Sequence, residues 1–223
     1  MEKDNKNRPF IAMGILKRVY YPGSGKDLDT LNFILSDFKY VEDIFYCDYL
    51  EHLSVEDLAS LSDWELIKEI PLTPADFRKE HWDEFWYNHE HSAHFAQPNG
   101  LDSKLYILLN KKNHKAVRFY QLGTEGVGTH QILRRSGHRP NLIFLADHGF
   151  GGNWNPNIWG EPEIHTENIS FLKQLANYNR FIMVDKTTNP WNGFEISPEI
   201  QHTRWSLYIK PIAFFKTKGG IRD

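Results

Sequence analysis

The stretch from Lys17 to Asp27 constrains the fold of this chain more than any other. An apolar run, Val19 to Tyr21, leads directly into Pro22-Gly23-Ser24-Gly25, and a helical pattern of apolar residues begins near Asp27. Strand, glycine turn and helix in this order open the ligand crevice of an open α/β sheet. Glycine lets backbone approach a ligand closely, and the helix directs free N–H groups at anionic atoms. The stretch therefore predicts a ligand site at the start of this helix.

Strand-like and helical patterns alternate along the chain, at 18–37, 43–66, 116–136 and 141–178. This alternation predicts an α/β fold, with a Rossmann-like, mostly parallel sheet and helices on both faces. Two β-rich runs, 104–109 and 116–122, are joined by a polar loop and predict an antiparallel hairpin or edge strand. We expect a single domain over 1–223, in which the aromatic and His-rich stretch 73–99 is an insertion or a lid.

Three element boundaries follow from local signals. Ser54-Val-Glu-Asp57 resembles a capping box and predicts a helix that continues through Leu66. A short strand is then expected at 68–72. The last strand is expected at 207–215.

Composition limits the classes of partner. The 223 residues include 26 basic and 29 acidic side chains, mixed along the chain, and give a net charge of −3. Since no basic stripe appears, a nucleic-acid partner is not expected. No stretch approaches the roughly 18 apolar residues of a membrane helix, and the charged first residues do not form a signal peptide. The lone Cys47 suits a reducing compartment, so we expect a cytoplasmic protein.

The expected strand ends converge on one place. Ligands in parallel sheets bind beyond the carboxyl ends of the strands, and buried strands here run into Asp48, Asp147 and Asp185. Asp147-His148-Gly149 opens a second glycine-rich loop, which continues to Asn153. The predicted small-molecule site therefore comprises Gly23, Ser24, Gly25, Asp48, Asp147, His148 and Gly149.

The order of strand, Gly-x-Gly turn, helix, and strand ending in an acid resembles the S-adenosylmethionine-dependent methyltransferases. The resemblance implies that Gly23 and Gly25 line the cofactor S-adenosylmethionine and that Asp48 meets its ribose hydroxyls, without a metal. Tyr21 stands where those enzymes have an acid, and Asn189-Pro190-Trp191 matches only half of their Asn-Pro-Pro-aromatic signature. The motif Tyr21-Pro-Gly-Ser-Gly-Lys-Asp27, together with 147–153, is also similar to a group of bacterial proteins of unknown function.

Two other functions stay open. His89, His91 and His94 place three imidazoles within six residues, with His81 upstream. The spacing resembles the His-x-His-x-Asp-His signature of metallo-β-lactamase-type hydrolases, with Ala93 in place of the Asp, and would imply a metal-dependent hydrolase. On a helix only His91 and His94 would share a face, so a solvated surface is the alternative for this cluster. The third function is a non-catalytic binding protein with a degenerate site. Gly23-Ser-Gly-Lys26 does not satisfy the phosphate-binding P-loop pattern, because Tyr20 and Asp27 occupy its first-glycine and hydroxyl positions.

Overall fold

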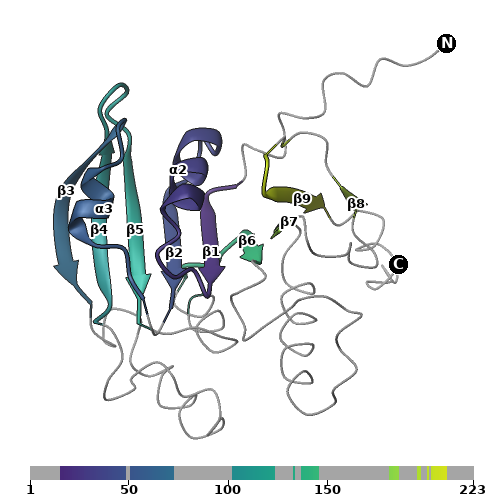
Figure 1. The fold of residues 1–223 in the computed structure, drawn as a ribbon, viewed down its shortest axis with the longest axis horizontal. Coiled ribbons are helices and arrows are strands. Elements are labelled where there is room, and N and C mark those ends of the chain that lie inside the picture. Colours follow the sequence, from purple (N-terminus) through teal and green to yellow (C-terminus); the bar gives the residue numbers. More distant parts are fainter. Residues whose placement is uncertain are drawn as a thin grey trace, which may run out of the picture. The chain divides into compact units, whose positions relative to one another are not determined.

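The computed structural model describes residues 16–48, 51–72, 102–123, 133, 137–145, 181–185, 195–196, 200 and 202–209. The chain divides into two compact units, Met1–Asn141 and Leu142–Asp223. Figure 1 shows the elements of each unit. Within the described ranges, no helix is long and apolar enough to cross a membrane. The predicted single domain over 1–223 stays a prediction, and the predicted insertion 73–99 lies outside the described residues.

The first unit contains five strands and two helices in its described part. In chain order they are β1 (Arg18–Pro22), α2 (Leu28–Asp37), β2 (Asp43–Cys47), α3 (Val55–Ala59), β3 (Trp64–Pro71), β4 (Lys104–Asn110) and β5 (Ala116–Leu122). The strand order is β3-β4-β5-β2-β1. β1, β2 and β5 run parallel, whereas β3 and β4 are antiparallel additions beside β5.

The second unit contains four described strands, β6 (Leu142–Leu145), β7 (Phe181–Asp185), β8 (Glu195–Ile196) and β9 (Trp205–Ile209). Their order is β6-β7-β9-β8, with β6 and β7 parallel and β9 antiparallel to both of its neighbours. Phe144 packs edge-on against the fully buried Trp205, with ring centroids 4.9 Å apart. Since aromatic pairs prefer this geometry, the contact stabilises the packing of β6 and β9 on either side of β7.

The core of the first unit lies on both faces of the central strand β2. Every residue of β2 is buried, as expected for a parallel strand covered on both sides. On one face Phe45 stacks on Tyr120 of β5, with centroids 4.5 Å apart, and His138 meets both rings edge-on. On the other face Tyr46 packs edge-on against Tyr21 and Phe119. Alternation of side chains along β2 therefore divides the core into two layers.

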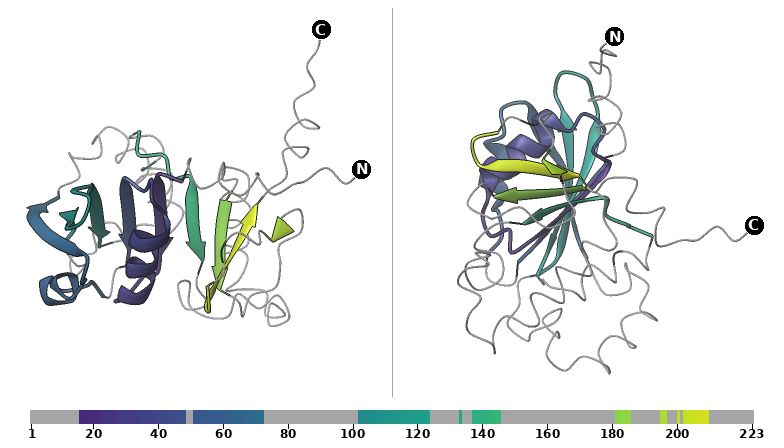
Figure 2. Two further views of the ribbon diagram at one scale, coloured as in Figure 1. Left: turned by 90° about the horizontal axis from the view of Figure 1, so that it is seen from above. Right: turned by 90° about the vertical axis from the view of Figure 1, so that its right-hand side faces the viewer.

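Both described helices cover the same face of the strands, as the two views of Figure 2 show. The side chains of this face agree with the view. The hydroxyls of Tyr21 and Tyr46 donate to Asp27 at the start of α2, and the Gln121 amide bonds the backbone of Leu53 just before α3. Tyr21, Tyr46 and Gln121 are paired directly across β1, β2 and β5, so they point to one side.

The predicted Rossmann-like α/β fold, mostly parallel and with helices on both faces, is wrong. The described elements are mainly strands, the two described helices lie on one face, and antiparallel pairings stand beside parallel ones. The antiparallel hairpin β4–β5 was predicted and is confirmed. The predicted strand–helix alternation does not continue along the chain, because a long antiparallel strand, β3, follows the second described helix.

The boundaries of α3 and β3 differ from those that the apolar pattern predicts. The capping box is confirmed, because the Ser54 hydroxyl accepts from Asp57 N and the Asp57 carboxylate accepts from Ser54 N. The predicted continuation to Leu66 is wrong, since α3 ends at Ala59 and the Ser60 hydroxyl bonds a carbonyl of its last turn. β3 then pairs with β4 from Trp64 to Pro71. These ladder hydrogen bonds and the burial of Trp64 outweigh local helix preference.

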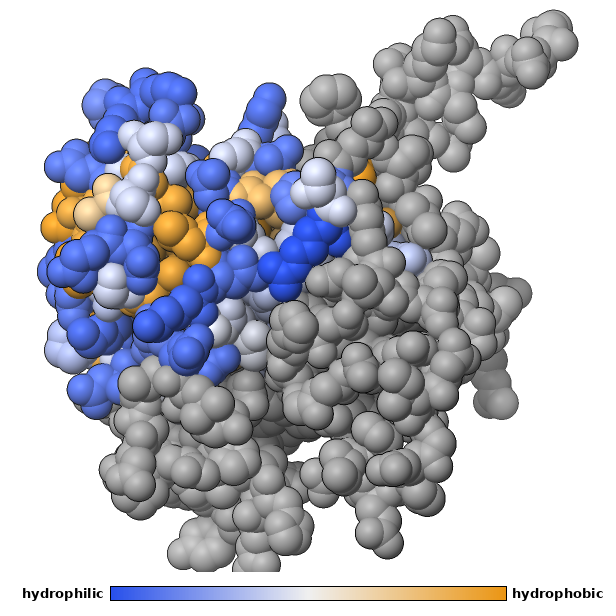
Figure 3. Space-filling model, in the orientation of Figure 1, coloured by the Kyte–Doolittle hydropathy of each residue, from blue (hydrophilic) through white to orange (hydrophobic). Residues whose placement is uncertain are grey.

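β3 lies at the edge of the first unit's strand order and carries features that oppose edge-to-edge association. Its ladder is irregular between Leu66 and Lys68, its middle is charged, and it ends at Pro71. Charges, bulges and prolines are the usual protections of an edge strand. Figure 3 shows apolar residues at the surface near α3 and β3, and Val55 and Ile67 are 41% and 51% exposed.

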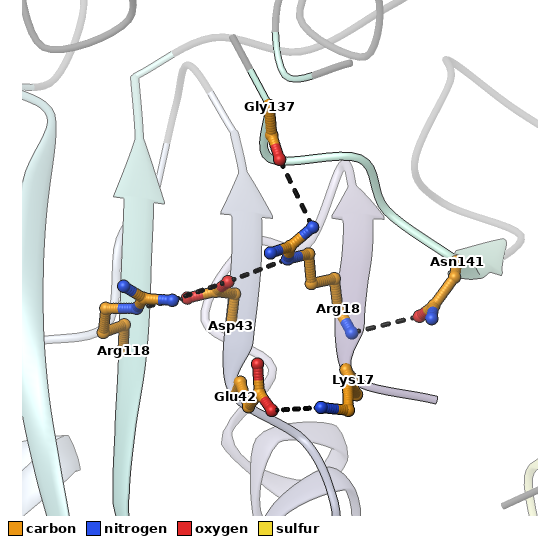
Figure 4. A network of polar contacts seen from close by, with 7 residues as sticks. All are labelled: Lys17, Arg18, Glu42, Asp43, Arg118, Gly137 and Asn141. Carbon is orange, nitrogen blue, oxygen red and sulfur yellow. Dashed lines mark hydrogen bonds and ion pairs between the residues drawn. The ribbon is translucent and has the colours of Figure 1, made fainter. Parts of the chain in front are cut away.

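An ionic network, the Arg18–Asp43–Arg118 cluster, joins the starts of β1, β2 and β5 (Figure 4). The Asp43 carboxylate is fully buried and accepts from Arg18 Nε at 3.1 Å and from Arg118 Nη2 at 3.0 Å, both through Oδ2. Arg118 Nε donates to its other oxygen. Arg18 also donates through Nη1 to the Gly137 carbonyl. Because each residue lies on a different strand, this buried carboxylate fixes the three strands in register.

Replacement of Asp43 tests this role. Asp43→Asn removes the charge that three guanidinium N–H groups share, and we expect it to lower the free energy of unfolding by about 2–3 kcal/mol. Urea unfolding monitored by tryptophan fluorescence measures the change. The control is Asp63→Asn, because Asp63 forms a half-exposed pair with Lys112 and should cost less than about 0.5 kcal/mol. Equal losses in the two variants would contradict the role of Asp43.

Candidate ligand site at the carboxyl ends of β1 and β2

The glycine turn lies beside the end of β2 because β1 and β2 pair in register. Pro22, the last residue of β1, is the partner of Cys47, the last residue of β2. The turn then folds over this end, and Gly23 N donates to the Cys47 carbonyl at 2.7 Å. Gly23 and Gly25 have φ of 61° and 49°. This left-handed conformation is unfavourable for residues that have a β-carbon, which explains why the turn contains two glycines.

The structure brings the predicted residues Gly25 and Asp48 into direct contact. The Asp48 carboxylate accepts from Gly25 N at 2.9 Å through Oδ2 and from Glu51 N at 3.0 Å through Oδ1. Two backbone donors therefore set the orientation of this carboxylate at the carboxyl end of β2. Ser24, which the prediction also included, is buried within the same turn.

The backbone N–H groups of this turn donate within the chain. Gly23 N and Ser24 N share the Cys47 carbonyl, Gly25 N donates to Asp48, and Asp27 N donates to the Ser24 carbonyl. The predicted start of the helix near Asp27 is confirmed, because Asp27 is the N-cap of α2. A carboxylate thus stands where a helix start or glycine turn would otherwise attract an anion.

Asp27 is held by its own contacts at the start of α2. Its carboxylate accepts from Thr30 N and Thr30 Oγ1, both at 2.9 Å, and from the Tyr21 hydroxyl at 2.7 Å. Tyr21 occupies the position at which the S-adenosylmethionine-dependent methyltransferases have an acidic residue. In this chain the Tyr21 hydroxyl hydrogen-bonds the N-cap residue of α2, so residues of both β1 and α2 stabilise the conformation of the turn.

The carboxyl end of β1 and β2 is acidic. Asp27, Asp48 and Glu51 lie around the turn, and Glu51 Oε2 is 3.6 Å from the position of a β-carbon on Gly25. Lys26 is an exposed basic residue of the same turn. Carboxylates attract cations and accept hydrogen bonds from hydroxyls, whereas they repel phosphate. The arrangement therefore favours a hydroxylated or cationic ligand over a nucleotide phosphate.

His52 belongs to this region, although the sequence gave no reason to single it out. Its Nε2 lies 3.2 Å from the Asp48 carbonyl oxygen. Burial lowers the pKa of the imidazole, which outweighs the opposing effect of hydrogen bonds to the carbonyls of Leu122 and Asp48 and of the Asp48 charge. A neutral imidazole therefore links the loop after β2 to the ends of β2 and β5. In the sequence, only its position four residues after Asp48 connects it with the predicted site.

The other predicted residues are not placed with this group. Asp147, His148 and Gly149 lie outside the described residues, and so do His81, His89, His91 and His94. Asp185 is the last residue of β7. In the part of the chain that the structure describes, no group of three or more His, Cys, Asp or Glu residues could hold a metal ion. Both the second glycine loop and the histidine cluster therefore stay predictions.

Comparison with known proteins gives no match: no family model, no curated protein and no solved structure matches the chain.

The neutral His52 predicts how stability depends on pH. Because its pKa in the folded state lies below the ordinary value of 6.5, the unfolded chain takes up the proton first, and folding loses stability as the pH falls below about 6.5. We expect His52→Gln to lose less stability than the unchanged protein between pH 7.5 and 5.5, measured by urea unfolding. Parallel pH curves for the two proteins would show that His52 does not contribute.

Proposed function

We propose that the chain binds a small molecule with hydroxyl and cationic groups at the carboxyl ends of β1 and β2, and that S-adenosylmethionine is this molecule. The observation that carries the proposal is the contact between Gly25 N and the Asp48 carboxylate. This contact places the glycine turn that follows β1 beside the acidic residue that follows β2. Both lie at the carboxyl ends of parallel strands, where ligands of such sheets bind.

The charge of the site supports this ligand class. S-adenosylmethionine carries a sulfonium and an ammonium group and has two vicinal ribose hydroxyls. Hydroxyl donors suit the fixed carboxylate of Asp48, and the cationic groups suit the neighbouring Asp27 and Glu51. A ligand that needs free turn N–H groups for phosphate is disfavoured, since those of Gly23, Ser24 and Gly25 already donate within the chain.

Bound S-adenosylmethionine would supply an activated methyl group, so methyl transfer to a second small molecule is the reaction that this proposal implies. In that reaction Asp48 and the glycine turn hold the cofactor. A cytoplasmic location is part of the proposal and is supported by Cys47, whose free thiol is buried in β2.

Calorimetric titration of S-adenosylmethionine tests the proposal. We expect micromolar binding to the unchanged protein, and binding weaker by about ten- to a hundred-fold in Asp48→Asn, because a charge-assisted hydrogen bond to the ligand is lost. Asp63→Asn is the matched control, since it removes the same charge from an exposed pair on the loop before β3. Absence of binding to the folded protein, or equal affinities in all three, would contradict the proposal.

A glycine pair separates ligand effects from backbone strain. Gly25 and Gly137 both have positive φ, of 49° and 86°, and a β-carbon would have no contact closer than 3.6 Å at Gly25 and none within 4 Å at Gly137. Alanine at either position should cost about 1–2 kcal/mol through strain alone. We expect only Gly25→Ala to weaken S-adenosylmethionine binding in calorimetry, because only Gly25 adjoins Asp48. Weaker binding in Gly137→Ala as well would attribute the effect to general destabilisation.

A further inference from the structure

We propose that Arg18 and Arg118 form a second binding site, for a phosphate or another doubly charged tetrahedral oxyanion, at the amino ends of β1, β2 and β5. This inference is independent of the proposed function. The two sites lie at opposite ends of the same parallel strands, because residues 18, 43 and 118 begin the register that ends at 22, 47 and 122.

Positive charge is in excess at the Arg18–Asp43–Arg118 cluster. Two guanidinium groups share the single carboxylate of Asp43. Arg18 Nε and Arg118 Nη2 both donate to Oδ2, at 3.1 and 3.0 Å, so these two like-charged groups approach to within about 6 Å of each other. Asp43 compensates only one of the two charges. Glu42 also interacts electrostatically with both guanidinium groups, but its carboxylate is paired with Lys17. A second anion at this place would compensate the other.

Both arginines of the cluster have N–H groups that the bonds to Asp43 and Gly137 do not use. A guanidinium has five N–H groups, and the bonds to Asp43 and Gly137 engage only two nitrogens of each arginine. The side chains of Arg18 and Arg118 are 34% and 47% exposed, whereas Asp43 is fully buried. The carboxylate thus holds the guanidiniums from within and leaves their other edges open to water. Preorganised guanidinium groups are the preferred ligands of phosphate in proteins.

The residues around the arginine pair are mainly basic. The loops and strand starts at this end carry six further basic residues in the described part of the chain: Lys17, Lys39, Lys111, Lys112, Lys115 and Arg139. The acidic residues of the described part at this end are Asp37, Glu42, Asp43, Asp63 and Glu65. Positive charge is therefore still in excess when Arg18 and Arg118 are included. The acidic group at Asp48 lies at the other end, and the resulting field draws an anion toward the arginine pair.

A small oxyanion fits better than a nucleic acid. Glu42 pairs with Lys17 and Asp63 pairs with Lys112, so carboxylates interrupt the basic edge. The chain also has a net charge of −3. A nucleic-acid backbone needs a continuous row of basic contacts, whereas one phosphate group needs only the arginine pair.

Calorimetric titration of inorganic phosphate at constant ionic strength, balanced with chloride, tests the site. We expect saturable binding to the unchanged protein and binding weaker by at least about tenfold in Arg118→Gln. Lys112→Gln is the matched control, because it removes one positive charge from the same edge but not from the arginine pair, and it should bind phosphate as the unchanged protein does. Circular dichroism checks that each variant is folded.

If Arg118→Gln does not fold, the double variant Arg118→Gln, Asp43→Asn replaces it, because it removes the buried carboxylate together with one of its partners. This variant should also lose phosphate binding. The proposal is overturned if phosphate gives no saturable heat beyond the chloride control, if folded arginine variants bind as tightly as the unchanged protein, or if Lys112→Gln weakens binding as much as Arg118→Gln does.

Discussion

The parallel register of β1, β2 and β5 is the constraint on which the rest of the first unit depends. It places Arg18, Asp43 and Arg118 side by side at one end, and Pro22, Cys47 and Leu122 at the other. The buried Asp43 carboxylate holds this register from the amino end, while the glycine turn and Asp48 close it at the carboxyl end. Because the strands are only five to seven residues long, a one-residue slip would break both groups of contacts.

The sequence signals that predicted structure correctly depend on interactions between residues that are close together in the sequence. Asp27 and Ser54 are the N-caps of α2 and α3, close to where the sequence predicted that helices begin. The strands on either side of the 110–115 loop form the predicted hairpin. Strand ends and parallel pairing also predicted that the glycine turn and Asp48 lie at the same edge of the sheet, and the structure adds the contact between Gly25 N and Asp48. The fold class failed because it depended on tertiary pairing: nothing near Trp64 reveals that 64–71 will lie against β4. The Arg18–Asp43–Arg118 cluster could not be foreseen for the same reason, since its members are far apart in sequence.

The structure separates charge along the strands. Carboxylates surround the glycine turn, and basic side chains gather where the same strands begin, on the described residues of the first unit. The turn itself satisfies its N–H groups with Cys47, Asp48 and Ser24. These two facts distinguish the turn from a phosphate-binding loop despite its glycines. They also explain why one ligand class is proposed for one end and the opposite class for the other. Two side chains stabilise the carboxyl end: His52 contacts the backbone carbonyl of Asp48, and the Tyr21 hydroxyl donates to the N-cap residue Asp27.

The proposed ligand site lies where the glycine turn meets Asp48. A ¹⁵N–¹H correlation spectrum recorded during titration with S-adenosylmethionine tests it most directly, because the amides of Gly25 and Glu51 both donate to the Asp48 carboxylate. Binding there should shift the signals of these two amides in a saturable way and leave the Nε–Hε signals of Arg18 and Arg118 unchanged. Shifts confined to the arginine end, or no shifts at saturating ligand, would contradict it.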